Sequence, residues 1–293
     1  MLENIVLNKN SKDINFEKGL YIIATPIGNK NDITIRSFFL LSLAKTVICE
    51  DTRVTKNLFK LLKISSKNKN WISYNDHSQT SKRNKILTEL TKNKIVCLVS
   101  DAGTPLISDP GYKLIQLVRK HGHNIYSIPG PSSVISSLVV SGLQTDKFTF
   151  LGFLPKNKNN YIKILRDFSI TKSSLILFEK SNRLSFFLTV LKANFFSFKL
   201  AIVRELTKIY EEIILIDQDN IDDFIKKKVK LKGEITIVLE IFNYKFKIYS
   251  DKELLKELKS FKPSQVSAMI SKKSSENREK IYKRCINLLN KEK

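Results

Sequence analysis

The sequence predicts an α/β protein with two α/β domains and a small helical extension at its C-terminal end. Two observations predict this class. Short apolar, β-branched runs alternate with amphipathic stretches over most of the 293 residues, and after about residue 250 only helical patterns remain. Strands that alternate with helices form mostly parallel sheets covered by helices. A content of 42% hydrophobic residues supplies real cores and excludes a disordered or collagen-like chain.

The first domain is predicted over residues 1–126. Its expected strands are at 20–25, 46–49, 71–74, 94–99 and 124–128, and its expected helices are at 33–44, 54–62, 83–90 and about 110–121. The run KIVCLV at 94–99 is almost entirely apolar, which is typical of a strand covered on both faces. Asp109 precedes Pro110, so we expect Asp109 to cap the next helix, with proline at the first helical position.

The second domain is predicted over residues 127–245, after the Pro129-Gly130-Pro131-Ser132-Ser133 segment. Its expected elements are strands at 148–153, 174–178, 200–204, 210–216 and 235–241, and helices at 161–168, 183–193 and 221–227. The third and fourth strands are close enough in sequence to form a hairpin. We therefore expect a mixed sheet.

The tail, residues 250–293, is predicted to hold helices at 252–259, 264–271 and 275–289. It carries 12 basic and 6 acidic residues from Asp251 onward. Two of these short helices, joined by the basic turn Lys272-Lys273, suit a helix-turn-helix module. A helical appendage on the surface of the body is an equally good interpretation.

The chain carries 51 basic and 28 acidic residues, which gives a formal net charge of +23. Such a charge favours a polyanionic partner. However, 42 of the 51 basic residues are lysine, a residue of A- and T-rich codons, so a drifting genome would raise the charge without any partner. No apolar run approaches the roughly 18 residues that span a bilayer, and the start lacks the pattern of a signal peptide. We expect a soluble, cytoplasmic protein with no membrane partner.

Metal and disulfide chemistry are not expected. The three cysteines, Cys49, Cys97 and Cys285, lie far apart, with no CxxC motif. The three histidines are not spaced as metal ligands on one helix face. A hydrolase triad is also disfavoured, because the chain has no GxSxG motif.

Four loops rich in small or polar residues follow predicted strands. They begin at Thr25-Pro26-Ile27-Gly28-Asn29, Glu50-Asp51-Thr52-Arg53, Asp101-Ala102-Gly103-Thr104-Pro105 and Pro129-Gly130-Pro131-Ser132-Ser133. Ligands of open α/β sheets bind beyond the carboxyl ends of strands. Each loop alone is explained equally well by helix capping or turn geometry. Together they predict a ligand held mainly by backbone groups, since neither GxGxxG nor GxxxxGK[ST] is present.

These segments, in this order, resemble one family. LYIIATPIGNKNDIT, ICEDTR, SDAGTPLISDPG, IPGPSS, FTFLGFLPK, RELTK and KGE look like the bacterial ribosomal RNA small-subunit methyltransferase I family of the tetrapyrrole-methylase superfamily. The resemblance covers about residues 19–240, and the tail resembles that family's helical extension. It implies two α/β domains with S-adenosylmethionine in the cleft between them, a homodimer, and 2′-O-methylation of a cytidine in the decoding region of 16S ribosomal RNA, free or in the assembled subunit.

The resemblance also implies site residues. The donor site would comprise Pro26, Ile27, Gly28, Asp101, Ala102, Gly103, Thr104, Ile107, Ser132, Ser133, Phe178, Glu205, Gly233 and Glu234. The acceptor of the ribose proton is expected among Asp51, Asp76 and Glu179. Where the family reads Tyr-Glu-Ser-Pro-His-Arg, this chain has Phe178-Glu179-Lys180-Ser181-Asn182-Arg183, so only Glu179 and Arg183 of that stretch carry over.

RNA is expected to be held through its phosphates. The candidate contacts are Arg53, Lys262, Lys272, Lys273, Arg278, Lys280, Lys283 and Arg284. Two alternatives remain from the sequence: a methylase of a small molecule such as a tetrapyrrole, and a non-catalytic RNA-binding assembly protein. The first is disfavoured because tetrapyrrole methylases usually carry GxGPGD in the first loop, where this chain has TPIGN. The second predicts no binding of a methyl donor.

Overall fold

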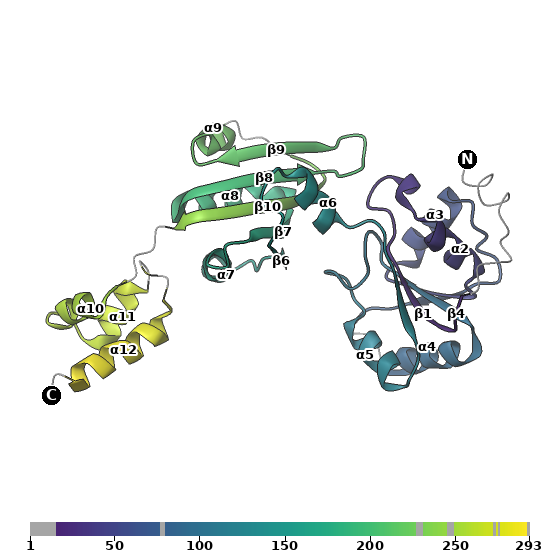
Figure 1. Cartoon of the computed structure of the whole chain (residues 1–293), viewed down its shortest axis with the longest axis horizontal. Coiled ribbons are helices and arrows are strands. Elements are labelled where there is room, and N and C mark those ends of the chain that lie inside the picture. Colours follow the sequence, from purple (N-terminus) through teal and green to yellow (C-terminus); the bar gives the residue numbers. More distant parts are fainter. Residues whose placement is uncertain are drawn as a thin grey trace. The chain divides into compact units, whose positions relative to one another are not determined.

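The structure is a computed structural model that describes residues 16–76, 80–226, 231–244, 249–271, 274 and 276–291 (Figure 1). The chain divides into two compact units. The first comprises Met1–Ser136 together with Glu205–Glu211, and the second comprises Ser137–Arg204 together with Glu212–Lys293. The short segment 205–211 is therefore part of the first unit although it lies far along the sequence.

The first unit is built on a five-stranded sheet in which every strand pair is parallel. Its strands are β1 (Gly19–Ile23), β2 (Thr46–Cys49), β3 (Asn70–Ser73), β4 (Ile95–Val99) and β5 (Ile125–Ile128). They lie in the order β3-β2-β4-β1-β5. β1 and β4 occupy the interior of the sheet, with Ile23 opposite Val99. The predicted parallel sheet is confirmed.

Helices cover both faces of this sheet. They are η1 (Lys30–Asp32), α2 (Ile35–Leu43), α3 (Thr52–Leu61), α4 (Thr80–Lys92) and α5 (Tyr112–Lys120). Leu40 of α2 and Phe59 of α3 belong to one buried cluster, whereas Ile86 of α4 and Leu114 of α5 belong to another. Strand residues alternate between the two clusters, as a strand's two-residue repeat requires.

The predicted capping role of Asp109 is wrong. α5 begins at Tyr112, and its N-cap is Gly111, whose φ of 141° favours glycine. The amide of Gly111 donates to Asp76 Oδ1 at 3.1 Å, so a carboxylate from a distant loop accepts at the start of this helix.

A helix that the sequence analysis does not predict, α6 (Ser133–Val140), follows the loop after β5. It begins in the first unit and ends in the second. Its sequence, SVISSLVV, is too uniformly apolar toward its end to show a clear helical repeat.

The second unit contains a mixed five-stranded sheet, as predicted. Its strands are β6 (Phe148–Phe153), β7 (Ser174–Lys180), β8 (Phe195–Arg204), β9 (Glu212–Asp217) and β10 (Glu234–Tyr244), in the order β6-β7-β10-β8-β9. β6 and β7 are parallel, and β8 and β9 form the expected antiparallel pair. Its helices are α7 (Lys158–Ser169), η2 (Ser181–Arg183), α8 (Leu184–Asn194) and α9 (Ile221–Lys226). Tyr161 and Phe187 lie in its main core.

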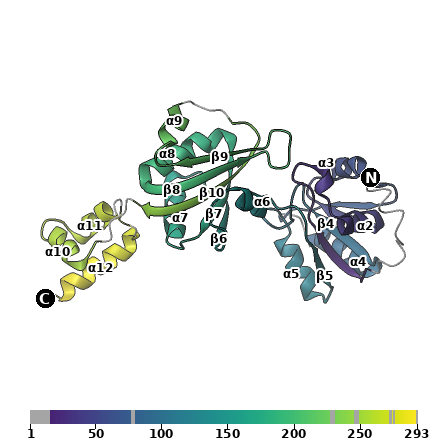
Figure 2. The ribbon, with the colours of Figure 1, turned by 45° about the horizontal axis from the view of Figure 1, so that its top comes forward.

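The tail forms three helices with a small core of their own, drawn in yellow-green and yellow in Figure 2. They are α10 (Asp251–Leu258), α11 (Pro263–Ile270) and α12 (Arg278–Lys291). Leu254, Val266 and Ile281 are buried together, one from each helix. The turn at Lys272 and Lys273 lies outside the described residues. Among the described residues, no helix combines the length and apolar character needed to cross a membrane.

Candidate functional site

Three of the predicted loops meet at the carboxyl edge of the first sheet. The loops after β1 and β4 pair through their backbones: the amide of Thr25 donates to the carbonyl of Gly103 at 2.8 Å, and the amide of Gly103 donates back at 3.0 Å. The hydroxyl of Thr104 donates to the carbonyl of Pro131 at 3.1 Å, which connects the loop after β5. Hydrogen bonds to main-chain groups thus hold together segments that lie far apart in the sequence.

The loop after β4 contains unusual backbone conformations. Gly103 has a φ of 77°, and the non-glycine residues Leu106 and Ser108 have φ values of 73° and 66°. Such conformations cost about 1–3 kcal/mol each for a side-chain-bearing residue and cluster at ligand sites. Ile107 lies between the two and is 45% exposed, although it is apolar. The strained backbone of this segment is therefore typical of a ligand-binding loop.

The loop after β5 approaches β1 closely. A Cβ added at Gly130 would lie 2.9 Å from Cβ of Ala24, so only glycine fits there. Ser132 caps α6, because its carbonyl accepts from the amide of Ser136 at 2.9 Å and its hydroxyl accepts from the amide of Ile135 at 3.4 Å. Ser132 and Ser133 are both partly exposed at the beginning of this helix.

Segment 205–211 packs on the loop after β1. The amide of Asn29 donates to the hydroxyl of Thr207 at 3.0 Å, and the amide of Thr207 donates to Glu211 Oε2 at 2.5 Å. A Cβ at Gly28 would lie within 2.5–2.8 Å of atoms in residues 206–208. Glu205, with a φ of 51°, pairs with Lys208 at 2.9 Å. Thr207 is not among the site residues predicted from the sequence, and the positive φ of Glu205 and Thr207 leaves no local sequence signal.

Carboxylates gather at the ends of β2 and β4. Arg53 clamps Asp51 with Nη2–Oδ2 at 2.6 Å and Nε–Oδ1 at 3.1 Å, and this hydrogen bonding lowers the pKa of Asp51 to about 2. The amide of Asp51 donates to Asp101 Oδ1 at 3.1 Å. Burial and the nearby Asp51 charge raise the pKa of Asp101, while the same amide opposes the shift. This hydrogen bond joins the loop after β2 to the loop after β4.

Two further acids belong to this group. Burial raises the pKa of Asp109 to about 6, and the charges of Glu50 and Asp101 add to the effect. Burial also raises the pKa of Glu50, again with contributions from Asp101 and Asp51. Asp76, in the loop after β3, accepts from the amide of Gly111 and is partly exposed. Within the described parts of the chain, no set of three or more His, Cys, Asp or Glu side chains is arranged to hold a metal ion.

The candidate residues of the second unit lie on neighbouring strands. In the antiparallel pair of β7 and β10, Glu234 is opposite Lys180 and Thr236 is opposite Phe178, so Gly233-Glu234 and Phe178-Glu179 share one end of the sheet. Glu179 is only 3% exposed and accepts from the Tyr161 hydroxyl at 2.8 Å and from the amide of Lys180 at 2.9 Å. Arg183 Nε lies 3.6 Å from Glu179 Oε1. Glu179 is therefore a buried carboxylate that already has hydrogen-bond and ion-pair partners within the protein.

The candidate RNA contacts fall into two sets. Arg53, in the first unit, is 89% exposed, and Lys262, Arg278, Lys280 and Lys283 are exposed on the tail. Arg284 instead ties the tail together, because it pairs with Asp251 at 2.5 Å and with Glu276, and donates to the carbonyl of Tyr249 at 3.1 Å. Lys272 and Lys273 lie outside the described residues.

Comparisons with known proteins show the family to which the chain belongs. The Tetrapyrrole (Corrin/Porphyrin) Methylases family matches residues 19–222. The chain is 42% identical over 223 residues to the ribosomal RNA small subunit methyltransferase I of Rickettsia prowazekii, covering 76% of this chain and 78% of that relative. It is 41% identical over 221 residues to the protein of the same name from Hydrogenobaculum sp., covering 75% and 94%.

Solved structures show the same fold. A cobalt precorrin-4 methyltransferase of cobalamin biosynthesis aligns with a TM-score of 0.54 at 19% identity, covering 75% of this chain and 93% of that one. A uroporphyrin-III C-methyltransferase of Thermus thermophilus, complexed with S-adenosyl homocysteine, aligns with a TM-score of 0.52 at 17% identity, covering 76% and 97%. From the matched family and the relatives that it covers, this chain belongs to the tetrapyrrole methylase family and, within it, to the ribosomal RNA small subunit methyltransferase I family.

Proposed function

We propose that this chain transfers a methyl group from S-adenosylmethionine to the 2′-oxygen of a cytidine in the decoding region of 16S ribosomal RNA. The observation that carries the proposal is the joining of the TPIGN, SDAGTP and PGPSS loops at one sheet edge, in a chain 42% identical to a ribosomal RNA methyltransferase. We further propose that it works in the cytoplasm as a homodimer, on ribosomal RNA or the assembled subunit.

The joined loops suit a donor that is held by main-chain groups. Gly103 and Gly130 leave no side chain over the backbone where the loops meet, and Ala102 is exposed beside Gly103. When bound, S-adenosylmethionine supplies an electrophilic methyl group on a sulfonium. Within the first unit, the residues assigned to donor binding are Pro26, Ile27, Gly28, Asp101, Ala102, Gly103, Thr104, Ile107, Ser132, Ser133 and Glu205. The carboxylates of Asp101 and its neighbours favour a positively charged ligand.

A carboxylate is assigned to accept the ribose proton, which contributes about 10²–10⁴-fold when such a group is well placed. The candidates differ in their surroundings. Asp51 is a weak base, because Arg53 holds its pKa at about 2. Glu179 is buried and already accepts two hydrogen bonds. Asp76 is partly exposed and uses one oxygen for Gly111, which favours Asp76 among the three.

The experiment supplies S-adenosylmethionine with a labelled methyl group to small ribosomal subunits and to purified 16S RNA. A 2′-O-methyl group blocks alkaline cleavage at its own linkage, so label in an alkali-resistant dinucleotide beginning with cytidine supports the proposal. Label in a base, or donor binding with label only in an added tetrapyrrole, would contradict it.

A matched pair of variants connects the activity to the joined loops. In Gly103→Val the new side chain meets Ile27, because a Cβ there lies 3.3 Å from Ile27 Cγ2. Gly122→Val places the same side chain at nearly the same φ, 72° against 77°, with nothing within 4 Å. We expect loss of donor affinity in calorimetry for the first variant and retention for the second. Equal affinities would place the donor elsewhere.

A further inference from the structure

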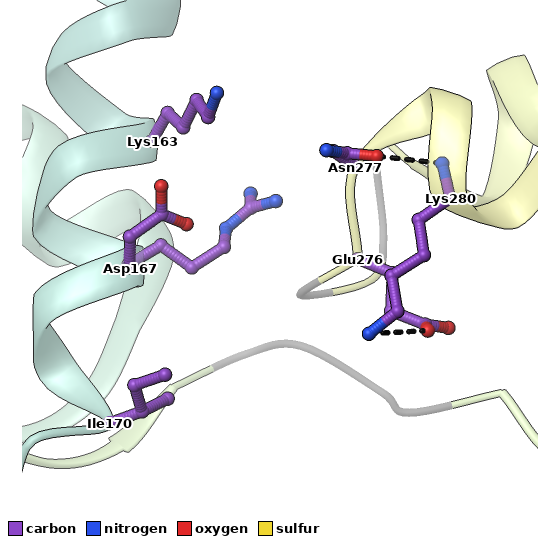
Figure 3. Close-up of a pocket in the computed structure, with 7 residues that line it drawn as sticks. Lys163, Asp167, Ile170, Glu276, Asn277 and Lys280 are labelled. Atoms are coloured by element: carbon purple, nitrogen blue, oxygen red, sulfur yellow. Dashed lines mark hydrogen bonds and ion pairs between the residues drawn. The ribbon is translucent and has the colours of Figure 1, made fainter.

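A pocket of about 370 Å³ lies in the second unit between α7 and the start of α12 (Figure 3). Its volume falls within the range of small-molecule sites. Charged side chains dominate its wall. Lys163, Arg166 and Asp167 come from α7, and Glu276 and Lys280 come from the beginning of α12 and the residues just before it. Figure 3 shows Lys163 on one side of the pocket and Asn277 and Lys280 on the other.

The carboxylate of Glu276 is neutralised within the tail. It pairs with Arg284, and its Oε1 lies 3.8 Å from Lys280 Nζ. Its side chain is only 13% exposed. Of the charged side chains that line the pocket, Lys163, Arg166 and Lys280 are cations, and the two carboxylates are Asp167 and Glu276, the latter paired also with Arg284 from outside the pocket. The pocket therefore carries an excess of positive charge.

Arg166 is held against the pocket by the tail. Its Nη1 donates to the carbonyl of Ser274 at 2.7 Å. Burial lowers the pKa of Arg166, with Asp167 opposing the shift, which means that its surroundings disfavour the charged form. An anion in the pocket would offset this cost.

The start of α12 adds to the same field. Asn277 Oδ1 accepts from the amide of Lys280 at 2.7 Å, and the helix continues for 14 residues, so the positive end of its dipole lies at the pocket. Lys156 and Lys158, both exposed, precede and open α7. Positive charge thus continues from the pocket along the helix toward its N-terminal end.

We propose that this pocket binds a phosphate of the RNA backbone, with Lys163 and Arg166 on one side and Lys280 on the other. The inference rests on the proposed function and adds to it a binding element outside the donor loops. In this proposal, α7 belongs to the substrate interface together with the tail.

The test compares full-length variants by filter binding to a 16S RNA fragment that contains the decoding region. Lys163→Gln and Lys280→Gln remove one charge each, and neither side chain belongs to a core; Lys280 is 69% exposed. Lys256→Gln on α10 is the control, since it removes a charge of the same tail outside the pocket. Affinity is measured from about 50 to 200 mM salt, the range over which phosphate contacts weaken strongly.

We expect the double variant at 163 and 280 to lose about one unit of the slope of log affinity against log salt, because the contact to one phosphate is lost, and Lys256→Gln to lose none. Donor affinity should be unchanged in all of them. If the double variant and the wild type have equal slopes, or if Lys256→Gln loses as much slope as the double variant, the pocket does not bind a phosphate of the RNA. Either result leaves the proposed methylation of RNA unaffected. A wild-type chain that neither binds nor methylates RNA would overturn the proposed function as well.

Discussion

Asp76 is the carboxylate whose surroundings best suit proton acceptance. We expect Asp76→Asn to lower kcat by roughly 10²-fold, whereas Asp51→Asn and Glu179→Gln lower it less. The amide oxygen of the substituted side chain can still accept from Gly111, so donor affinity should be kept. Initial rates of methyl transfer and calorimetry with S-adenosylmethionine separate the two effects. Full turnover in all three variants would mean that none of these carboxylates is the acceptor.

Asp109 makes the stability of the first unit depend on pH. Its folded pKa, about 6, is raised above the ordinary value of 3.8, so the folded state holds a proton more tightly than the unfolded state. Stability is therefore lost as the pH rises through the window from about 4 to 6, by up to about 3 kcal/mol and by less after solvent screening. Asp109→Asn removes this dependence.

Urea unfolding at about pH 4.5 and about pH 7.5 measures the effect. The wild type should lose stability relative to Asp109→Asn as the pH rises. Asp32→Asn, at an exposed acid in η1, provides the control. A constant difference between Asp109→Asn and the wild type at both pH values would contradict the buried position of this carboxyl.

At the scale of elements, segment 205–211 positions the loop after β1. Gly28→Ala forces a Cβ to within 2.8 Å of three neighbouring residues, including the backbone carbonyl of Leu206. Thr207→Val removes the hydroxyl that accepts from Asn29, whereas Thr207→Ser keeps it. We expect about a tenfold or greater loss of donor affinity for Gly28→Ala and Thr207→Val, corresponding to about 1.4 kcal/mol or more.

Thr207→Ser should retain the affinity, because it keeps the hydroxyl and loses only the methyl group. This difference separates positioning of the loop from general loss of stability, which thermal unfolding of each variant checks. If Thr207→Val and Thr207→Ser bind S-adenosylmethionine equally, the hydrogen bond to Asn29 has no part in shaping the site.

The sequence predicted elements better than it predicted contacts between them. The strands of the first sheet were found because runs such as KIVCLV are local and apolar. The cap of α5 was misplaced because the acceptor for Gly111 comes from Asp76, 35 residues away. The contact of Asn29 with Thr207 spans 178 residues and has no local pattern. That these loops share an edge could be inferred because each follows a strand of a mostly parallel sheet, whereas the hydrogen bonds that join them could not be inferred.

At the scale of the whole molecule, the tail is expected to supply part of the grip on RNA. It has its own core and several exposed cations. Deletion of residues 251–293 should weaken RNA binding and flatten its salt dependence, since fewer counterions are released. Donor affinity should persist, because the joined loops belong to the first unit. RNA binding that is unchanged across a salt series would exclude the tail from the interface.

The long separation between Asn29 and Thr207 has a consequence for synthesis of the chain. Translation at about 5–20 residues per second leaves about 10–35 seconds between the emergence of these two residues. Throughout that interval, the amide of Asn29 in the nascent loop after β1 lacks the Thr207 hydroxyl that later accepts its hydrogen bond. A chain that stalls or is cut before residue 205 keeps all five strands of its first sheet, yet never completes this loop. Donor binding would then distinguish finished chains from truncated ones.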